Sequence, residues 1–215
     1  MESVKTHPCL RPLPKPSREW RMDEAIRIHT QKNGVDIRGN EVKKKFHLVP
    51  KGLRRLDLEA RALQRMVGAT GIPLLLEHSR KEERMVMSRL PGVDLTHWLQ
   101  SPDYTFVSLR IVVTEMLERG VASRATPPRN VIVQLHGTAG LVDLERVTLR
   151  WSQWTLIWWF ACGITNFRFL RLLAKYAPHP MTFSEHRRLA WQWRLRGGEK
   201  AVPAPGVNQP PSSRV

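Results

Sequence analysis

The sequence predicts an α+β fold in which a small, mostly β N-terminal part precedes a helical C-terminal part. Apolar residues alternate along 41–48, as in a half-buried strand, and two β-branched runs between 131 and 142 enclose a glycine-containing turn. Strong helix formers dominate 57–66, and 109–119 has an amphipathic helical pattern. With 215 residues, 41% of them hydrophobic, the chain can bury the core of one such domain but not of two full domains.

Both ends of the chain differ in composition from this region. Residues 1–18 contain four prolines and residues 202–215 contain another four, so we expect disordered tails over 1–18 and 199–215. The first residues hold no apolar stretch of the kind found in secretory signals. Cys9 and Cys162 show neither metal-ligand spacing nor a disulfide framework, which favours a reducing, cytoplasmic compartment.

The strand expected over 41–48 contains the first candidate site residue. Its alternating residues share one face: Val42, Lys44, Phe46 and Leu48. Lys44 therefore lies among apolar neighbours, where an ammonium group requires a carboxylate partner or a phosphate. The pattern alone sets the register, so Lys43 or Lys45 could be the inward residue instead. Three consecutive lysines are also typical of a solvated edge strand.

The helix expected over 57–66 supplies a partner for this lysine. Leu56, Leu63 and Met66 fall on roughly one face of the pattern, and Glu59 lies on the same helix. We therefore expect an ion pair between Glu59 and Lys44. Two strands separated by a polar turn are expected next, at 71–77 and 84–90.

The expected hairpin between 131 and 142 carries the most specific chemical signal. Asn130 precedes its first strand and Asp143 follows its second, so both side chains should lie at one end of the hairpin. An amide oxygen and a carboxylate are ligands that a hard cation such as Mg²⁺ takes. A surface hairpin with a solvated Asn and a solvated Asp would give the same pattern.

Five segments between residues 41 and 146 occur in the order in which a protein kinase uses them. The run Ser123 to Asn130 (SRATPPRN) matches H-R-D-x-x-x-x-N without a gap, and Asp143-Leu144-Glu145 stands in the place of D-F-G. The chain thus resembles small bacterial protein-kinase-like proteins of the lipopolysaccharide-core-kinase and RIO-like kind. Members of that group often read D-x-E here and lack a long activation segment.

The resemblance implies a two-lobed, ATP-binding fold, with an N-lobe over 19–90 and a reduced C-lobe over 91–198. The segment from Ser88 to Leu90 would be the hinge whose backbone binds the adenine edge. Met87 would line the pocket behind that hinge.

The resemblance also implies roles for the charged residues. Lys44, oriented by Glu59, would face the α- and β-phosphates of ATP, and Asn130 and Asp143 would hold Mg²⁺. Lys44 and Asp143 would then be the residues on which catalysis depends.

Two departures from the kinase pattern change this expectation. No G-x-G-x-x-G is present: the region before the lysine strand offers only Asn33-Gly34, a candidate hairpin turn, and Gly39. Ala125 stands at the position of the catalytic aspartate, and loss of a positioned general base typically costs about 100- to 10,000-fold in rate. We therefore expect a pseudokinase-like site that binds nucleotide and metal, or a slow kinase.

The chain carries a formal charge of +16, which attracts polyanions at low salt. The partner could be nucleic acid, an anionic lipid surface or a phosphorylated saccharide. The basic residues are spread along the chain and belong to no recognised nucleic-acid module. Charge alone supports only salt-sensitive, non-specific association with nucleic acid.

Tryptophans concentrate after the catalytic segment, in an aromatic run over 151–164 that is followed by the pattern of an amphipathic helix over 167–176. The run is interrupted by polar residues and is too short to span a membrane. It could be a buried helix packed beneath the hairpin. It could also be an interfacial element, since Trp prefers the headgroup level and nearby Arg and Lys favour anionic lipid.

Three functions follow from these patterns. The first is an ATP- and Mg²⁺-binding phosphotransferase-family protein with weak or absent catalysis that acts on lipopolysaccharide core or another envelope glycolipid, peripherally at the inner face of the cytoplasmic membrane. The second is an inactive pseudokinase that serves as a regulatory or scaffold module for a protein partner. The third is a basic protein associated peripherally with membranes or nucleic acid.

Overall fold

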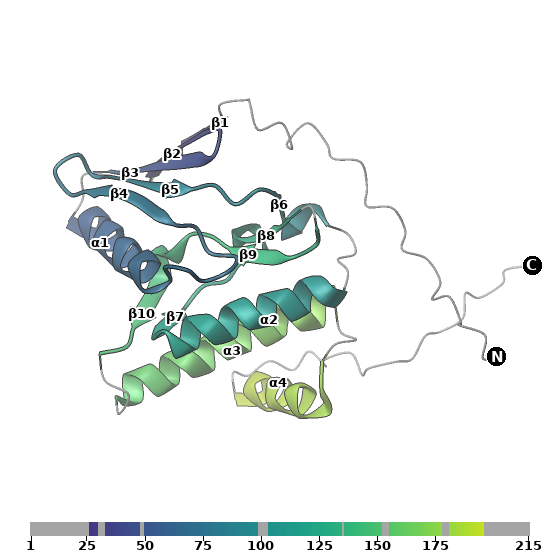
Figure 1. Ribbon diagram of the computed structural model, residues 1–215. Helices are drawn as coiled ribbons and strands as arrows, with labels where there is room; N and C mark the ends of the chain where they lie inside the picture. The colour runs from purple at the N-terminus through teal and green to yellow at the C-terminus, as the bar shows by residue number, and fades with distance from the viewer. Residues whose placement is uncertain are drawn as a thin grey trace, which may run out of the picture.

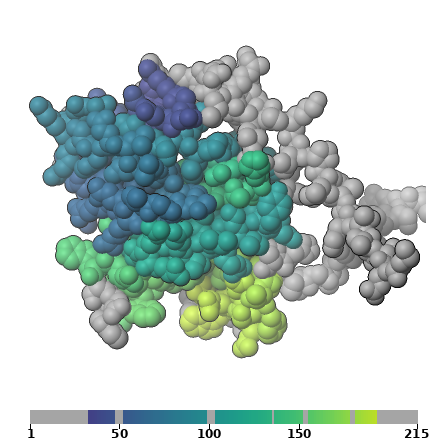
Figure 2. Space-filling view, in the orientation of Figure 1, coloured from purple at the N-terminus to yellow at the C-terminus, as the bar shows by residue number. Residues whose placement is uncertain are grey.

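A computed structural model describes residues 26–29, 33–47, 50–98, 103–134, 136–151, 155–177 and 181–195. These residues form an N-terminal β-sheet lobe with one helix and a C-terminal lobe dominated by helices (Figure 1). In the space-filling view the purple and blue N-terminal lobe lies directly on the teal and green C-terminal lobe (Figure 2). The tails expected over 1–18 and 199–215 lie outside the described residues.

The N-terminal lobe is built on a five-stranded antiparallel sheet with the order β1-β2-β3-β5-β4. Its strands are β1 (Ile26–His29), β2 (Asn33–Arg38), β3 (Glu41–Phe46), β4 (Leu75–Ser79) and β5 (Arg84–Ser88). The predicted alternation along β3 is confirmed, because Lys44 and Phe46 are buried while Lys43 and Lys45 are exposed. Leu48 lies outside the described residues.

Helix α1 (Pro50–Arg65) contacts the sheet and also the C-terminal lobe. Proline suits its first position, where the backbone N–H would have no helical partner. The guanidinium of Arg119 donates to the carbonyls of Arg65 and Val67, at 3.3 and 2.7 Å. Arg65 in turn donates to the carbonyls of Gly120 and Arg150, at 3.1 and 3.0 Å. These bonds hold the C-terminal end of α1 against the other lobe.

The C-terminal lobe combines short strands with three helices. The helices are α2 (Asp103–Glu118), α3 (Leu156–Tyr176) and α4 (Phe183–Leu195). Strands β6 (Val93–Asp94), β8 (Val131–Val133) and β9 (Ala139–Leu141) form one sheet, and β7 (Val121–Ser123) pairs with β10 (Val147–Leu149). Three 3-10 helices connect them: η2 (Leu95–His97), η3 (Pro128–Asn130) and η4 (Leu144–Arg146).

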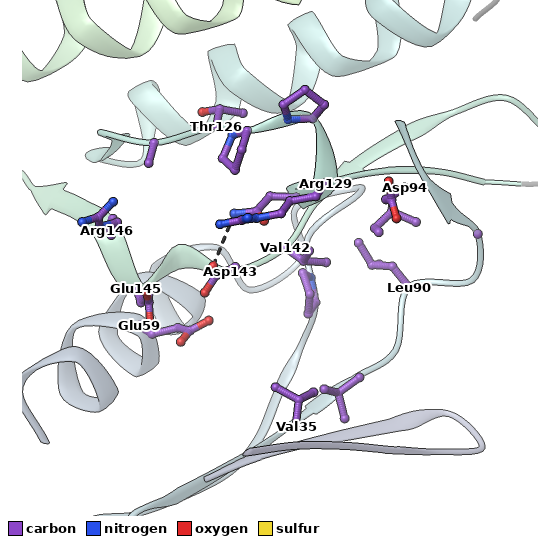
Figure 3. Close-up of a pocket in the computed structure, with 18 of the residues that line it drawn as sticks. Val35, Glu59, Leu90, Asp94, Thr126, Arg129, Val142, Asp143, Glu145 and Arg146 are labelled. Atoms are coloured by element: carbon purple, nitrogen blue, oxygen red, sulfur yellow. Dashed lines mark hydrogen bonds between the residues drawn. The ribbon is translucent and has the colours of Figure 1, made fainter. Parts of the chain in front are cut away.

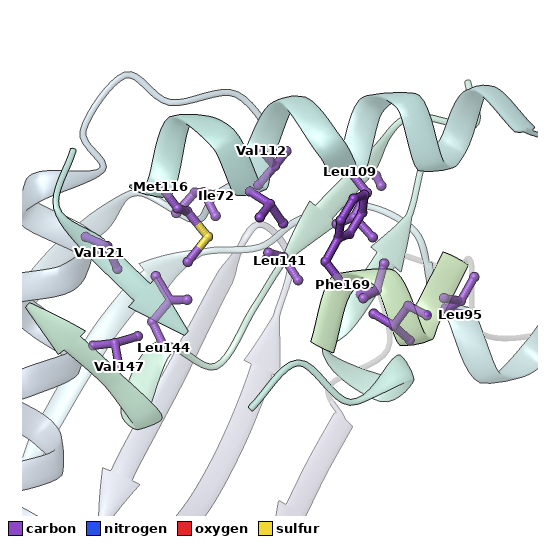
Figure 4. Close-up of a cluster of buried hydrophobic side chains, with 14 of the residues drawn as sticks. Ile72, Leu95, Leu109, Val112, Met116, Val121, Leu141, Leu144, Val147 and Phe169 are labelled. Carbon is purple, nitrogen blue, oxygen red and sulfur yellow. The ribbon is translucent and has the colours of Figure 1, made fainter. Parts of the chain in front are cut away.

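The apolar core of this lobe lies between α2 and the short strands (Figure 4). Leu109, Val112 and Met116 recur at helical spacing and are buried against these strands. Phe169 from α3 and Ile72 from the segment before β4 complete the cluster. The hairpin β8–β9 is therefore fixed by apolar packing, with Val131 opposite Leu141 and Val133 opposite Ala139.

One predicted turn is wrong, and one predicted strand is only partly correct. Asn33 and Gly34 begin β2 rather than forming a turn, and the β2–β3 turn contains Gly39, whose φ of 53° suits glycine. The strand expected over 71–77 begins only at Leu75. Gly71 instead accepts a hydrogen bond from the Leu141 N–H at 2.8 Å.

The aromatic region is not divided into two segments as expected. Residues 156–176 form the single helix α3, and Gly163 lies within it without interrupting it. In the described residues, none of the helices combines the length and the apolar character required to cross a bilayer.

Helix α4 is tied to α2 by a bidentate ion pair between Arg110 and Glu185, with Nη1 donating to Oε1 and Nη2 donating to Oε2 at 3.2 Å. Burial by itself raises the pKa of Glu185, but hydrogen bonds from Arg110 and from the Thr182 N–H outweigh it, so this pKa lies below its ordinary 4.5. The stabilisation from this pair is complete above pH 4.5 and is lost as pH falls through the lowered value.

We predict that Glu185→Gln lowers the free energy of unfolding by roughly 1 kcal/mol at pH 7, since the pair is charge-assisted but partly exposed. The loss should shrink as the pH falls below 4.5, where the wild-type carboxyl also becomes neutral. Urea unfolding at both pH values measures this. Glu41→Gln is the control, because Glu41 only approaches exposed Lys43 at 4.0 Å. An equal loss in both variants would contradict the prediction.

Candidate functional site

A cavity of about 1320 Å³ lies between the two lobes. Side chains of β2, β3 and β5 line it from the sheet side, among them Val35, Val42 and Met87. Asn130, Val142 and Asp143 line it from the hairpin side. Figure 3 shows Val35 near the sheet, Leu90 beside Asp94, and Asp143 next to Glu59 and Glu145 on the opposite side of the cavity from Leu90.

The predicted ion pair between Lys44 and Glu59 is present. The Lys44 ammonium donates to Glu59 Oε2 at 2.8 Å and to Asp143 Oδ1 at 2.6 Å. The Glu59 side chain is only 1% exposed. A carboxylate so fully removed from water is unfavourable unless a cation such as Lys44 faces it. Three segments far apart in the sequence thus meet at one ammonium group.

The pKa values of this cluster follow from burial and charge. Burial alone lowers the pKa of Lys44, but the carboxylates of Glu59 and Asp143 outweigh that effect, and the pKa is raised above its ordinary value. Complete burial raises the pKa of Glu59, against the attraction of Lys44. Burial therefore favours the neutral form of Glu59, whereas the Lys44 ammonium favours its ionised form.

Asn130 and Asp143 lie together, as the hairpin pattern predicts. The Asn130 amide donates to Asp143 Oδ2 at 3.3 Å, and the Val142 N–H donates to the Asn130 carbonyl at 2.9 Å (Figure 3). Asp143 adopts a left-handed backbone conformation with φ of 65°, which is costly for a residue other than glycine. The hydrogen bonds from Lys44 and Asn130 hold the Asp143 side chain in this conformation.

This pair offers an incomplete set of oxygen ligands for a divalent cation. No group of three or more His, Cys, Asp or Glu side chains among the described residues could hold a metal by itself. One carboxylate and one amide nonetheless fit Mg²⁺, which keeps several waters and takes its remaining ligands from substrate phosphates.

Two residues of the site were not assigned from the sequence. Glu145 lies 3.9 Å from the Lys44 ammonium and accepts a hydrogen bond from the Asn33 amide at 3.2 Å. The D-x-E motif was a signal for Glu145. No local pattern marks Asn33, because its partner is 112 positions away.

The predicted hinge lines the cavity through Met87, Ser88 and Leu90. Its backbone donors are partly used, since the N–H of Ser88 bonds to Leu74 at 2.8 Å and that of Arg89 bonds to Asn40 at 2.7 Å. Within the described residues, the Leu90 N–H makes no hydrogen bond.

The hinge leads into β6 through Gly92, at the place where β6 pairs with β8. A Cβ at Gly92 would lie 2.3 Å from the Val133 carbonyl oxygen, and its φ is 148°. Only glycine permits this approach between the hinge and the hairpin.

Ala125 lines the cavity at the position that aligns with the aspartate of H-R-D, and it brings no acidic group. The loop around it is held by Ser123, whose hydroxyl donates to the Ala125 carbonyl at 3.0 Å. Thr126 donates to the same Ser123 hydroxyl at 3.4 Å. The loop is therefore ordered by hydroxyl groups rather than by the missing histidine and aspartate.

The sheet lobe, the helical lobe and the lysine–glutamate–aspartate cluster between them define a protein-kinase-like fold. The structure of monomeric WbdD matches with a TM-score of 0.54 and 18% identity over 75% of this chain. WbdD with the kinase inhibitor LY294002 matches with a TM-score of 0.50 and 16% identity over 84% of this chain. The Rio2 kinase-ADP/Mg²⁺-phosphoaspartate complex from Chaetomium thermophilum matches with a TM-score of 0.51 and 13% identity over 82%.

These TM-scores show a common fold, and at 13–18% identity they show the fold alone. The chain spans 40% of the monomeric WbdD chain and 66% of the Rio2 chain. No protein-family model and no curated protein matches the sequence.

We predict that Lys44→Met lowers the free energy of unfolding at pH 8 by about 3–5 kcal/mol, because it leaves Glu59 buried without a cation. The raised pKa of Glu59 should then rise further, so the variant should regain stability as pH falls and the carboxyl becomes neutral.

Adding Glu59→Gln to Lys44→Met provides the internal control. The double variant should recover part of the loss and should depend less on pH between 5 and 8. Chemical unfolding at both pH values is the measurement. Additive losses in the double variant would show that the two residues are not coupled.

Proposed function

We propose that this chain is a protein-kinase-like phosphotransferase-family protein that binds ATP and Mg²⁺ between its lobes, with slow or absent catalysis. The observation that carries the proposal is the convergence of Lys44, Glu59 and Asp143 at 2.8 and 2.6 Å beside Asn130. A buried ammonium held by two carboxylates, next to an amide–carboxylate pair, suits a nucleotide polyphosphate with its cation.

Each residue has a proposed role. Lys44, held by Glu59, neutralises the α- and β-phosphates. Asp143 and Asn130 hold Mg²⁺, which when bound neutralises charge on the phosphates. Leu90 donates its free backbone N–H to the adenine edge.

Met87, Ser88 and the apolar residues of the sheet form the walls of the proposed adenine pocket. Val35 and Val42 also line the cavity on this side. Apolar walls with a few polar groups are typical of sites for small ligands.

We expect catalysis to be slow or absent. Ala125 cannot accept a proton from an attacking hydroxyl group, and a missing general base typically costs about 100- to 10,000-fold. The acceptor that we propose is an envelope glycolipid such as lipopolysaccharide core. This proposal is supported by the resemblance of residues 123–130 and 143–145 to lipopolysaccharide-core kinases. If turnover is absent, the same nucleotide site belongs to a pseudokinase that binds a protein partner.

We predict that ATP with Mg²⁺ raises the melting temperature of the wild-type protein and that Asp143→Asn removes most of this increase. At 100 times the dissociation constant, a ligand contributes about 2.7 kcal/mol, which is readily visible in a thermal melt. Asp103→Asn is the matched control, because Asp103 is exposed at the start of α2 and does not line the cavity.

The absence of any shift at millimolar ATP would overturn the nucleotide site. Where the shift is present, ADP formation separates an enzyme from a scaffold. Slow ADP formation that is lost in Lys44→Met identifies an enzyme. An ATP-dependent rise in melting temperature without ADP formation identifies a pseudokinase.

We further propose, as a second candidate function, that the N-terminal end of α3 binds an anionic membrane surface. Four large apolar residues are exposed there: Leu156, Ile157, Trp159 and Phe160. Trp158 is different, since it is only 6% exposed and packs on Ala122 and Ala161. Exposed aromatic residues on a strongly basic protein suit the headgroup region of anionic lipid.

We predict that the protein sediments with vesicles containing anionic phosphatidylglycerol and that Trp159→Ser with Phe160→Ser reduces the bound fraction several-fold. Trp158 is left intact because its replacement would disturb packing. Ile111→Ser on α2 removes an exposed apolar residue elsewhere and serves as the control. Equal binding by all three proteins would leave only non-specific charge attraction.

A further inference from the structure

The side of the cavity formed by the C-terminal lobe carries a cluster of cations, here called the basic floor. Its six residues are Arg124, Arg129, Arg146, Arg168, Arg171 and Lys175. None of them comes from the N-terminal sheet that carries Lys44. The sequence distributes them over more than fifty positions, and the fold brings them to one surface.

Helix α3 supplies half of the basic floor. Arg168, Arg171 and Lys175 are spaced by three and four positions, so they share one face of the helix. One turn earlier, the Thr165 hydroxyl donates to the Ser123 carbonyl at 2.9 Å. This bond fixes that turn of α3 beneath the loop that contains Ala125.

The remaining cations come from two segments that are bonded to each other. The Arg124 N–H donates to the Arg146 carbonyl at 2.9 Å, which joins the Ala125 loop to the residue that follows Asp143-Leu144-Glu145. Arg129 directly precedes Asn130, whose amide donates to Asp143 Oδ2 at 3.3 Å. The basic floor therefore begins next to the proposed phosphate and metal site.

Most of these cations have no acidic partner. In the part of the chain that the structure describes, Arg124, Arg129, Arg146, Arg168 and Lys175 form no ion pair with a carboxylate. Arg168 Nε is also buried without a hydrogen-bond partner. Gathered like charges repel one another, and a polyanionic ligand would relieve that repulsion.

The acidic residues of the cavity gather around Lys44 and at the hinge, next to the basic floor. Glu59, Asp143 and Glu145 surround Lys44, and Asp94 is bonded to Thr96 beyond the hinge. Ala125 stands where an aspartate would have added a negative charge to the floor. An anionic acceptor would account for both features. It would bind to the cations of the floor, and it would need no general base.

We propose, on the basis of the phosphotransferase function proposed above, that the basic floor binds a phosphate monoester and that an ionised oxygen of its phosphate is the nucleophile. A phosphate monoester carries a charge of about −1.5 to −2 at pH 7, since its second pKa is about 6. Its attacking oxygen has already lost its proton. No general base is required, and alanine at position 125 costs nothing.

The chemical step balances without a proton transfer. An oxygen of the acceptor phosphate forms a bond to the γ-phosphorus of ATP, and the bond between that phosphorus and the β–γ bridging oxygen breaks. The bridging oxygen leaves with its electron pair as part of ADP. The products are ADP and a diphosphate monoester, and the total charge is unchanged.

Binding is tested with the full chain by thermal melts in the presence of glycerol 3-phosphate, glucose 6-phosphate or the corresponding neutral polyol and sugar. Sulfate at equal ionic strength controls for general anion effects. We expect the phosphate esters alone to raise the melting temperature, and Arg168→Gln with Arg171→Gln to abolish that shift. Arg187→Gln with Arg188→Gln removes the same charge from exposed positions on α4 and should leave the shift intact.

The ATP–Mg²⁺ shift separates this proposal from the function on which it rests. It should persist in the Arg168→Gln, Arg171→Gln variant, because Lys44 and Asp143 are unchanged. Loss of the ATP shift in the wild type would refute the nucleotide site itself. A normal ATP shift without a phosphate-ester shift, or with an equal loss in the α4 variant, would overturn the basic floor alone.

Phosphorus NMR identifies the nucleophile. Transfer to phosphate produces two new coupled resonances of a P–O–P group besides those of ATP and ADP, whereas transfer to a hydroxyl produces a second, uncoupled monoester. We expect the coupled pair, and we expect Ala125→Asp to slow its formation at least tenfold by placing a negative charge against the acceptor. An uncoupled product, binding of the esters without conversion, or faster transfer in Ala125→Asp would overturn the assignment.

Discussion

The ammonium group of Lys44 is the point on which the arrangement of both lobes depends. It donates hydrogen bonds to Glu59 on α1 and to Asp143 at the end of the hairpin, so one cation joins the sheet, the helix and the hairpin. Burying these charges is unfavourable unless every one has a partner. A shift of α1 or of the hairpin by a few ångströms would therefore leave a desolvated carboxylate unpaired, and the cluster selects one relative position of its three elements.

Hydrogen bonds from arginines to backbone carbonyls and one close backbone approach maintain the same geometry. Arg119 binds the carbonyl of the last residue of α1 and that of Val67 just beyond it, and Arg65 donates two hydrogen bonds to the C-terminal lobe. Gly92 allows the hinge to approach β8 closely. The helix that carries Glu59 is thus fixed at its middle by charge and at its end by backbone hydrogen bonds, which favours a preformed site over one that assembles on binding.

Charge is divided within the cavity. Carboxylates gather around Lys44, where a polyphosphate and its cation would bind, and cations gather on the floor formed by α3 and the Ala125 loop. A formal charge of +16 spread evenly would give only a general attraction for polyanions. The division gives the cavity two chemically different halves, and it connects the absence of an aspartate at position 125 with the nature of the acceptor.

The sequence by itself determined the elements whose pattern is local. Alternation along β3 favoured Lys44 as the inward residue over Lys43 and Lys45, helical spacing placed Glu59 on α1, and the hairpin brought Asn130 to Asp143, because a strand or helix period decides which side chains share a face. Only the tertiary structure decided the contact between Asn33 and Glu145 and the gathering of the basic floor. Contacts between residues many tens of positions apart leave no periodic trace in either segment, since they arise only when the packed elements meet.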